Sequence, residues 1–389
     1  MHLIALERVP SLDRGGQEKN LLEICRDLVN RGHKVTLLYE REGNSLDQYR
    51  EFCESVWHVD AYGFDRRRPK TVLQFFRNVA GIGKIPVYKD SIVFSNTCHT
   101  VTFGYALSRF RRLPFVCYFQ TPFSSDLNRQ NQFALAHTDR YIAVSHQTKQ
   151  TWVEFGLPDS KIEVVHNGTD LSQFKPPQDF LATRQQWGIS EHAKVVSYAG
   201  RIDPEKGIEY LIKAVALLAT QEPDIKLMIA GRPVVHINAV KGTECEDKGM
   251  NYQRSLEQLA KDLGIGDRVQ FVGHLSDPAS LYQISDVSVL PSIWAEPFGR
   301  SIIESLACGT PVVASRAGGI PEILTGELAA NLVPARDEKA LAKGLSEVIH
   351  WRETDPGLGQ RCSDHVVNHF SLESMIGGVE KTLLSAAKT

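Results

Sequence analysis

Hydrophobic and polar residues alternate in blocks along the chain, and the blocks predict strands and helices in turn. Residues 3–6 form a short apolar run that is typical of a buried strand, and apolar residues at helical spacing follow between residues 21 and 29. A second apolar run at residues 35–38 completes a strand, helix, strand unit. Further strands are predicted at residues 92–94, 115–118, 141–144 and 162–165.

The same pattern starts again after a polar, proline-bearing stretch around residues 175–178. Residues 195–199 predict a strand, residues 200–207 a loop, and residues 208–218 one apolar helical face. Residues 233–250 have the composition of a loop insertion. Later strands are predicted at residues 226–230, 269–272, 287–290 and 312–315. The alternation predicts an α/β protein with two Rossmann-like, doubly wound domains that face each other across a cleft.

The composition is that of a soluble globular chain, and it excludes several classes of protein. The 389 residues include 42% hydrophobic residues and a nearly balanced charge of -2, which is too apolar and too balanced for a disordered chain. No apolar run approaches the roughly 18 residues of a membrane span, and no signal peptide is expected before the first strand. The seven cysteines have neither Cys-x-x-Cys nor zinc-finger spacing, so a reduced, cytoplasmic setting is expected.

Positive charge gathers in the first half of the chain. Residues 1–190 carry 24 Lys+Arg and 20 Asp+Glu, and the basic residues form runs at residues 66–70 and 109–112, with Phe76 and Phe110 nearby. Such runs suit a solvated face, or else a contact with an acidic membrane or an anionic acceptor. Peripheral contact at the inner membrane face stays open, whereas nucleic acid is not expected as a partner.

Four clusters follow predicted strands, which is where an α/β sheet places its ligand. The first, Gly15 and Gly16, opens a helix whose exposed N–H groups and positive dipole end suit a phosphate. The second, residues 200–207, contains Arg201 and Lys206, which can hold a diphosphate from two sides. Taken singly, a glycine pair is as often only a turn, and two loop cations are as often simply solvated.

The other two clusters lie near the end of the chain. Residues 296–304 place Glu296 in a loop and Glu304 about a turn and a half into the following helix. Two acceptor-only groups at this spacing can each bind hydroxyls of one elongated polyol, although either one alone also fits a helix start or an exposed surface. Residues 317–322 contain adjacent glycines that would supply backbone donors beside the same site, or form only a strand-to-helix turn.

Together and in this order, the clusters resemble the GT-B glycosyltransferases of family 4. These are retaining enzymes that take an α-linked sugar from a nucleotide diphosphate donor. The similarity covers almost the whole chain, and its most specific signals are the Glu-x7-Glu pair and the Gly200-Arg201 and Lys206-Gly207 motifs. The other matching positions are residues 15–16, 31–33, 145, 165–170, 174, 176, 309–314 and 318–319.

The resemblance implies a role for each matching residue. Arg201 and Lys206 would bind the donor diphosphate and stabilise it as a leaving group, helped by the backbone at Gly16. Glu296 would contact the hydroxyls of the donor sugar, and Glu304 the nucleotide ribose. The remaining donor-binding residues that it implies are Gly15, Gly200, His274, Leu275, Phe298 and Gly299.

The resemblance also implies the domain organisation. Residues 1–180 would form an acceptor-side Rossmann-like domain, and residues 181–370 a Rossmann-like domain that binds the nucleotide sugar. The last helix, at about residues 371–389, would cross back to the first domain.

Residue 120 departs from the family pattern. Many members have a histidine near the reacting sugar after the strand equivalent to residues 115–119, and this chain has Gln120 there. A glutamine cannot act as a general acid or base. Either Gln120 only hydrogen-bonds the donor sugar, or His99, which follows the preceding strand, has a related role on the acceptor side.

The predicted function is retaining hexosyl transfer from a UDP-, GDP- or ADP-sugar to a hydroxyl of a glycan, a lipid-linked sugar or a soluble sugar. No metal and no other cofactor is expected, because cations stand at the phosphate loops and no Asp-x-Asp pair lies beside them. The alternative is a protein of the same fold that binds a nucleotide sugar without transferring it. A nicotinamide-dependent dehydrogenase is disfavoured, because the first loop lacks the Gly-x-Gly-x-x-Gly pattern.

Overall fold

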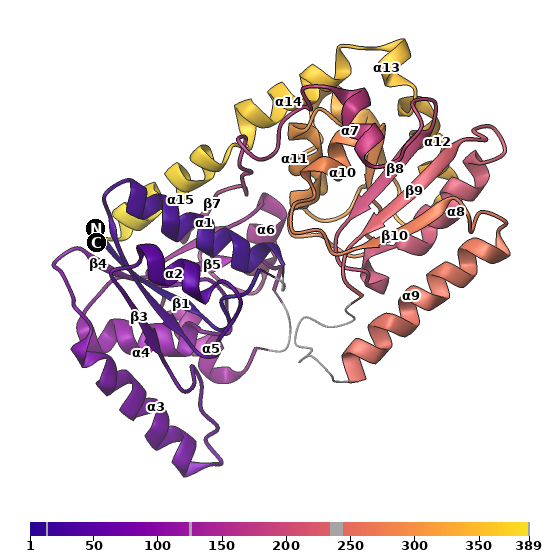
Figure 1. Cartoon of the computed structure of the whole chain (residues 1–389). Helices are drawn as coiled ribbons and strands as arrows, with labels where there is room; N and C mark the ends of the chain where they lie inside the picture. The colour runs from indigo at the N-terminus through magenta and orange to yellow at the C-terminus, as the bar shows by residue number, and fades with distance from the viewer. Residues whose placement is uncertain (13–14, 124–126, 234–243, 388–389) are drawn as a thin grey trace. The chain divides into compact units, whose positions relative to one another are not determined.

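The computed structural model describes residues 1–12, 15–123, 127–233 and 244–387, and the chain folds into two compact units. Unit 1 consists of Met1–Asn167 together with Glu373–Thr389, and unit 2 consists of Gly168–Leu372. Each unit has its own parallel sheet with helices on both faces, as the ribbon shows (Figure 1).

The sheet of unit 1 has seven strands in the order β3-β2-β1-β4-β5-β6-β7, and all its pairings are parallel. The strands are β1 (His2–Glu7), β2 (Lys34–Tyr39), β3 (Ser55–His58), β4 (Ser91–Ser95), β5 (Phe115–Phe119), β6 (Arg140–Ala143) and β7 (Ile162–Val164). The chain winds outward from β1 in one direction and then from β4 in the other. The switch between β1 and β4 is therefore where an open α/β sheet binds its ligand.

The helices of unit 1 pack on this sheet through apolar faces. They are α1 (Gly16–Asn30), α2 (Leu46–Phe52), α3 (Pro69–Gly81), α4 (Val101–Arg111), α5 (Arg129–Ala136), α6 (His146–Glu154) and α15 (Leu372–Ala386), with short turns η1 (Ile82–Lys84) and η2 (Asp159–Lys161). Ser145 begins α6 by accepting a hydrogen bond from Thr148 N at 3.0 Å. Two turns on, the buried Trp152 ring stacks on Phe119 of β5 at 3.9 Å between centroids, which fixes α6 to the sheet.

The sheet of unit 2 has six parallel strands in the order β10-β9-β8-β11-β12-β13. The strands are β8 (Lys194–Ala199), β9 (Ile225–Ala230), β10 (Val269–Gly273), β11 (Val287–Leu290), β12 (Val312–Ser315) and β13 (Leu332–Val333). Here the winding direction changes between β8 and β11, so the carboxyl ends of these two strands border the expected ligand position.

The helices of unit 2 surround this second sheet. They are α7 (Phe180–Gln186), α8 (Ile208–Leu218), α9 (Glu244–Asp262), α10 (Ala279–Ile284), α11 (Arg300–Ala307), α12 (Glu338–Val348), α13 (Trp351–Thr354) and α14 (Leu358–His369), with short turns η3 (Pro204–Lys206), η4 (Ile320–Glu322) and η5 (Gly326–Asn331). The apolar stripe of α8, from Ile208 to Leu218, is buried as its spacing predicts. Among the described helices of both units, none is long and apolar enough to cross a bilayer.

The two parallel sheets confirm the predicted fold class of two Rossmann-like α/β domains. Two short strands, β3 and β13, have no counterpart in the prediction, since neither has a long apolar run. The predicted loop insertion is wrong from Glu244 onward, because α9 begins there, and residues 234–243 lie outside the described residues. The start of α9 is rich in charged residues and lacks the apolar periodicity that predicts a helix.

The first segment of unit 1 ends at Asn167, whereas the sequence places the domain boundary at residue 180. The residues after Asn167 pack within unit 2. Thr169 N donates to Phe370 O at 2.9 Å, and the Phe174 ring lies 6.4 Å from that of Tyr282. The polar stretch on which the sequence boundary depends is therefore already part of unit 2.

The last helix, α15, belongs to unit 1 from Glu373 onward. Glu380 accepts a hydrogen bond from Arg31 at 2.8 Å and contacts His33 Nε2 at 2.6 Å. A Cβ atom at Gly378 would stand 2.9 Å from Val165, so glycine is needed for the close approach of α15 to the end of β7.

Candidate functional site

Glycines bring the carboxyl ends of β8, β9 and β10 into contact in unit 2. Gly200 N donates to Ala230 O at 3.0 Å, and Gly231 N donates to Gly273 O at 2.8 Å. Gly231 has a φ of +155°, and a Cβ atom there would overlap the carbonyl oxygen of Gly200, so no other residue fits. The loop that carries Arg201 therefore leaves the sheet at a fixed place.

Backbone contacts also join three of the four clusters that the sequence singles out. Gly207 has a φ of +67°, and a Cβ there would overlap the carbonyl oxygen of Pro291. Gly318, with a φ of +59°, packs in the same way on the backbone of Glu296, and Gly319 N donates to Glu296 O at 2.7 Å. Residues 200–207, residues 317–322 and the loop 291–299, which contains the first part of the 296–304 cluster, thus meet at the carboxyl edge of the unit 2 sheet.

Lys206 and Glu296 form a buried ion pair at this edge. Lys206 Nζ lies 2.9 and 2.7 Å from the two carboxylate oxygens, and the side chains are 10% and 12% exposed. Ser292 Oγ and Trp294 Nε1 also donate to Glu296 Oε2, at 2.9 and 3.0 Å. Burial opposes ionisation, but the charge and hydrogen bonds of Lys206, Ser292 and Trp294 outweigh it and hold the pKa of Glu296 below its ordinary value.

Arg201 is paired as well. Its Nη1 atom lies 3.2 Å from Asp203 Oδ2, and Tyr198 OH donates to the Arg201 carbonyl oxygen at 2.6 Å. Asp203 is almost completely buried, and its other oxygen accepts from Glu205 N at 3.0 Å, which begins η3. The contact with Asp203 uses one of the five N–H donors of the guanidinium.

Glu304 lies in α11, one turn after the start of the helix. Gly299, with a φ of +116°, precedes the first helical residue, Arg300. Arg300 Nε lies 3.5 Å from Glu304 Oε1, and Tyr282 OH donates to Glu304 Oε2 at 3.4 Å. Burial and the Glu304 charge raise the pKa of the Tyr282 hydroxyl, so it remains a neutral donor.

Each charged residue predicted for unit 2 therefore has an opposite charge beside it, and the three pairs have no net formal charge. Sequence reasoning missed the partners Asp203 and Arg300. For Arg300, its spacing of four residues from Glu304 within a helix is a local signal. Sequence reasoning had no signal for the pairing of Lys206 with Glu296, which lie 90 residues apart. The pairs hold the cations in place before any ligand binds.

Three other predicted donor-binding residues lie in the same part of unit 2. His274 is exposed directly after β10, and Leu275 is half-buried against the cluster that includes Ala230. Phe298 is buried, with its ring 5.8 Å from that of Phe370, so its side chain belongs to the core.

In unit 1, the first turn of α1 is tied to the loops after β4 and β5. Gly15 precedes the helix with a φ of +148°, and Gly16 is its first residue. The Gln17 carbonyl oxygen accepts from Asn96 Nδ2 at 3.1 Å and from Gln120 Nε2 at 3.4 Å. The glycine turn and Gln120 therefore lie together at the switch between β1 and β4.

Gln120 is the centre of a buried chain of amides. Its Nε2 donates to Asn96 Oδ1 at 2.7 Å, and its Oε1 accepts from Asn20 Nδ2 at 2.6 Å. Asn96 in turn donates to Glu7 at 3.1 Å, and Asn20 donates to Asn167 at 2.8 Å. Both ends of the Gln120 amide thus bind other side chains of unit 1, a network that the sequence does not indicate.

Glu7 ends this chain at the carboxyl end of β1. Burial and the neighbouring charge of Glu18 raise the pKa of Glu7 to about 7, against the hydrogen bond from Asn96. His99 is exposed in the turn before α4, three residues after Asn96, and its backbone N donates to Thr97 Oγ1 at 3.3 Å.

Two family models match consecutive parts of the chain. The model described as Glycosyltransferase Family 4 matches residues 14–173, and the model described as Glycosyl transferases group 1 matches residues 179–362.

Curated relatives match part of the chain. The D-inositol 3-phosphate glycosyltransferase of Mycolicibacterium vanbaalenii is 34% identical over 256 residues, which are 63% of this chain and 53% of that protein. The protein of the same name from Geodermatophilus obscurus is 34% identical over 223 residues, 56% of this chain and 47% of that protein. The chain thus spans about half the length of the curated relatives it matches.

Solved structures match over nearly the whole chain. Anabaena HepE in complex with UDP and glucose has a TM-score of 0.81 and 23% identity, over 99% of this chain and 100% of that one. A glycosyltransferase of Rickettsia africae has a TM-score of 0.83 and 19% identity, and the match covers 100% of this chain and 99% of that one. At these identities the similarity shows a common fold.

Proposed function

Because this chain belongs to the GT-B glycosyltransferases of family 4, we propose that it transfers a sugar from a nucleotide diphosphate sugar to an acceptor hydroxyl and retains the anomeric configuration. The observation that carries the proposal is the cluster of Arg201, Lys206, Glu296 and Glu304 at the carboxyl edge of the unit 2 sheet. HepE, which shares the fold, is described in complexes with UDP and with UDP-glucose, and this supports a nucleotide-sugar donor.

Stabilisation of the leaving group would supply most of the catalysis. A nucleoside diphosphate gains negative charge as its bond to the sugar breaks, and cations that are already in place lower the free energy of that transition state. Lys206 gives two hydrogen bonds to Glu296 and has a third N–H for a phosphate oxygen. Arg201, held by Asp203, offers the rest of its planar fork to the same diphosphate.

The two glutamates would bind the rest of the donor. Lys206 keeps Glu296 ionised, so this carboxylate accepts hydrogen bonds from sugar hydroxyls without donating any. Glu304, one turn into α11, would accept from the ribose. The acceptor hydroxyl then attacks from the side that the diphosphate leaves.

In unit 1, the first N–H groups of α1 at Gly15 and Gly16 would add backbone donors for phosphate. Gln120 would act as a neutral hydrogen-bonding group toward the donor sugar. Its bonds to Asn20 and Asn96 fix the orientation of its amide. His99 remains a candidate for the acceptor side.

No metal takes part in the proposed mechanism, because Arg201 and Lys206 supply the positive charge that the leaving group needs. The acceptor is proposed only as a hydroxyl of a sugar, free or linked to a lipid. The curated relatives are named for D-inositol 3-phosphate, but they match over about half of their length.

A screen of donors tests the proposal. Purified protein is melted with UDP, GDP and ADP and with their sugars, since a ligand at about a hundredfold over its dissociation constant adds roughly 2.7 kcal/mol to the free energy of unfolding. The nucleotide sugar that gives a shift is then incubated with candidate acceptors. Product with the donor's anomeric configuration supports the proposal, whereas a thermal shift without any product would favour the silent binding protein.

A further inference from the structure

The most exposed large apolar side chains of the described residues gather on three neighbouring helices of unit 1. Leu73 and Phe76 of α3 are 63% and 58% exposed, Phe110 of α4 is 57% exposed, and Phe133 of α5 is 55% exposed. Helix α4 contacts both α3 and α5, and the three helices lie together along the lower border of unit 1 (Figure 1). We call this surface the α3–α4–α5 face.

Helix α3 has two apolar sides, and only one of them packs in the core. Phe75 and Val79 are buried, and the Phe75 ring lies 5.8 Å from that of Phe103 in α4. Leu73 and Phe76 stand on the outer side of the same helix. A short helix in a folded unit has little reason to expose such residues together unless they contact another surface.

The segment that contains α3 and α4 is rich in basic residues. Residues 66–112 contain ten basic residues and one acidic residue, Asp90, although the whole chain has a net charge of -2. Asp90 binds the N-terminal amine at 3.0 Å and so does not neutralise this face. Two of the cations are paired, Arg68 with Asp65 and Arg109 with Asp139.

The other cations next to the apolar side chains are exposed. Arg66, Arg67 and Lys70 lie at the start of α3, and Arg77 follows Phe76 directly. Cations next to exposed leucine and phenylalanine are the combination that binds the headgroup region of an anionic bilayer, since the cations attract the lipid phosphates and the apolar side chains enter the boundary.

We propose that the α3–α4–α5 face docks unit 1 on the surface of an anionic phospholipid bilayer. A polyanion such as nucleic acid would use the cations but give no burial to Leu73, Phe76 and Phe110. A bilayer uses both features, and it accommodates apolar side chains that come from three separate helices. This docking does not depend on the proposed sugar transfer, because it is measured without any donor.

Vesicle sedimentation with the full chain tests the proposal. Phosphatidylcholine vesicles with phosphatidylglycerol should bind the protein, vesicles without it should bind far less, and added salt should weaken binding because it screens the phosphates. Replacing Arg66, Arg67 and Lys70 together by Gln should weaken binding on the order of a hundredfold, at about fivefold for each cation near the surface. Phe76→Ser should also weaken binding, and the size of this loss should not depend on the salt concentration.

The matched control removes the same charge from unit 2, through Lys226→Gln, Lys339→Gln and Lys343→Gln, three exposed lysines. This control should bind anionic vesicles like the wild type. Equal binding of the wild type to both kinds of vesicle would overturn the proposal, as would equal binding of the Arg66, Arg67 and Lys70 variant and the wild type. Retention on immobilised heparin without vesicle binding would assign the face to a polyanion and would overturn it too.

Discussion

A buried ion pair lies at each end of the unit 2 sheet, and the two pairs have similar lengths. Lys206 and Glu296 meet at 2.7 Å beyond the carboxyl ends of β8 and β11. Arg184 and Asp286 meet at 2.6 Å at the amino ends of the same strands, since Asp286 directly precedes β11 and accepts from Val195 N of β8 at 2.7 Å. The four side chains differ in what else they bind.

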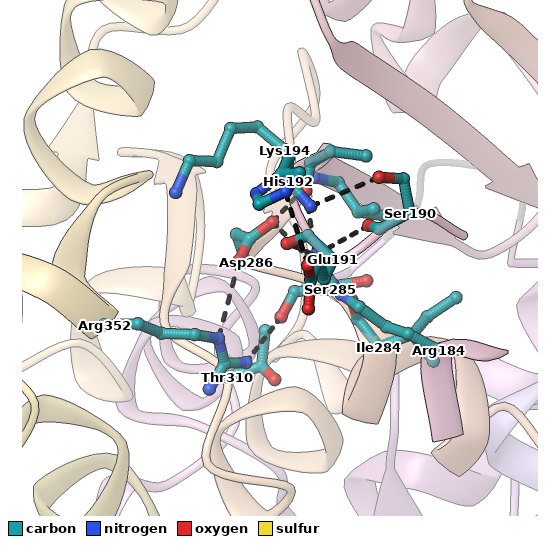
Figure 2. Close-up of polar contacts among 12 residues, drawn as sticks. Arg184, Ser190, Glu191, His192, Lys194, Ile284, Ser285, Asp286, Thr310 and Arg352 are labelled. Carbon is teal, nitrogen blue, oxygen red and sulfur yellow. Dashed lines mark hydrogen bonds and ion pairs between the residues drawn. The ribbon is translucent and has the colours of Figure 1, made fainter. Parts of the chain in front are cut away.

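The protein itself satisfies the guanidinium of Arg184. Its Nε donates to Ile284 O at 2.9 Å, and its Nη1 donates to Ala193 O and Glu191 O at 2.8 and 3.2 Å (Figure 2). Its Nη2 is bonded to Asp286, and both side chains are 2% exposed. These contacts join α7 and the start of β8 to the loop before β11, which is a structural function.

A second arginine completes this cluster. Arg352 Nε lies 3.4 Å from Asp286 Oδ1, and its guanidinium stacks over Phe180 at 3.8 Å and Trp351 at 4.2 Å. Burial and the Arg184 charge lower the pKa of Arg352 to about 10, although Asp286 opposes this. Asp286 is thus the counter-ion of both Arg184 and Arg352.

Burial and ion pairing therefore do not by themselves identify a functional site. At the amino ends, backbone carbonyl oxygens accept hydrogen bonds from Arg184, and the guanidinium of Arg352 stacks over aromatic rings. At the carboxyl ends, Lys206 and Arg201 each have N–H donors beyond those used by Glu296 and Asp203, next to glycine-shaped loops. The difference predicts that one pair mainly supports folding and the other mainly supports activity.

The largest expected effect is on stability. Asp286→Ala leaves Arg184 and Arg352 without their counter-ion in a buried place, so the free energy of unfolding should fall by about 3 to 5 kcal/mol. Urea unfolding of the full chain measures it. As a control, Asp355→Ala breaks the exposed pair with Arg361 and should cost at most about 1 kcal/mol. A loss of under about 1 kcal/mol for Asp286→Ala would show that the amino-end cluster is not a structural centre.

The next effect is on turnover. Arg201→Ala and Lys206→Ala should each lower turnover by roughly a hundredfold or more, as the loss of one donor to a developing anion does. Lys343→Ala, which removes an exposed lysine of α12, is the matched control and should leave turnover unchanged. If both site variants turn over nearly normally, the assignment of these residues is wrong.

A smaller effect is expected at Gln120. Gln120→Ala removes one neutral hydrogen bond to the donor, worth about 0.5 to 1.5 kcal/mol, and turnover should fall from a few-fold to about tenfold. Gln120→His should be tolerated, because a neutral imidazole keeps one hydrogen-bond donor and one acceptor at this position. Wild-type turnover in Gln120→Ala would make this position structural only and would turn attention to His99.

The smallest expected effect is that of a chelator. Excess EDTA should leave turnover unchanged, since the proposed mechanism uses Arg201 and Lys206 where other enzymes use a metal. Loss of activity in EDTA with rescue by magnesium or manganese would contradict the mechanism.

The sequence predicts the sheets well for a physical reason. Strands buried on both faces are continuous apolar runs, so residues such as 92–94 and 195–199 stand out. By contrast, β3 includes polar residues and is only partly buried, and β13 has two residues. The glycines and charges after these strands indicate the candidate site. The sequence does not distinguish Arg184 from a solvated arginine, because its buried counter-ion, Asp286, lies 102 residues away in the chain. The hydrogen-bonded amide side chains around Gln120 are not predicted for the same reason, because Asn20 and Asn96 are distant from Gln120 in the sequence.

In the proposed reaction, the carboxyl-end cluster of unit 2 promotes departure of a nucleoside diphosphate. The most direct measurement is hydrolysis of UDP-, GDP- and ADP-sugars by the purified chain, in which water serves as the acceptor and no natural acceptor has to be known. Phosphorus NMR detects the released diphosphate, and proton NMR identifies the anomeric configuration in which the free sugar is first released. We expect release from one donor with the anomeric configuration retained. Release should be at least about a hundredfold slower in Lys206→Ala and unchanged in Lys343→Ala. A donor that stabilises the fold but releases no diphosphate, or releases it equally fast in Lys206→Ala, would contradict it.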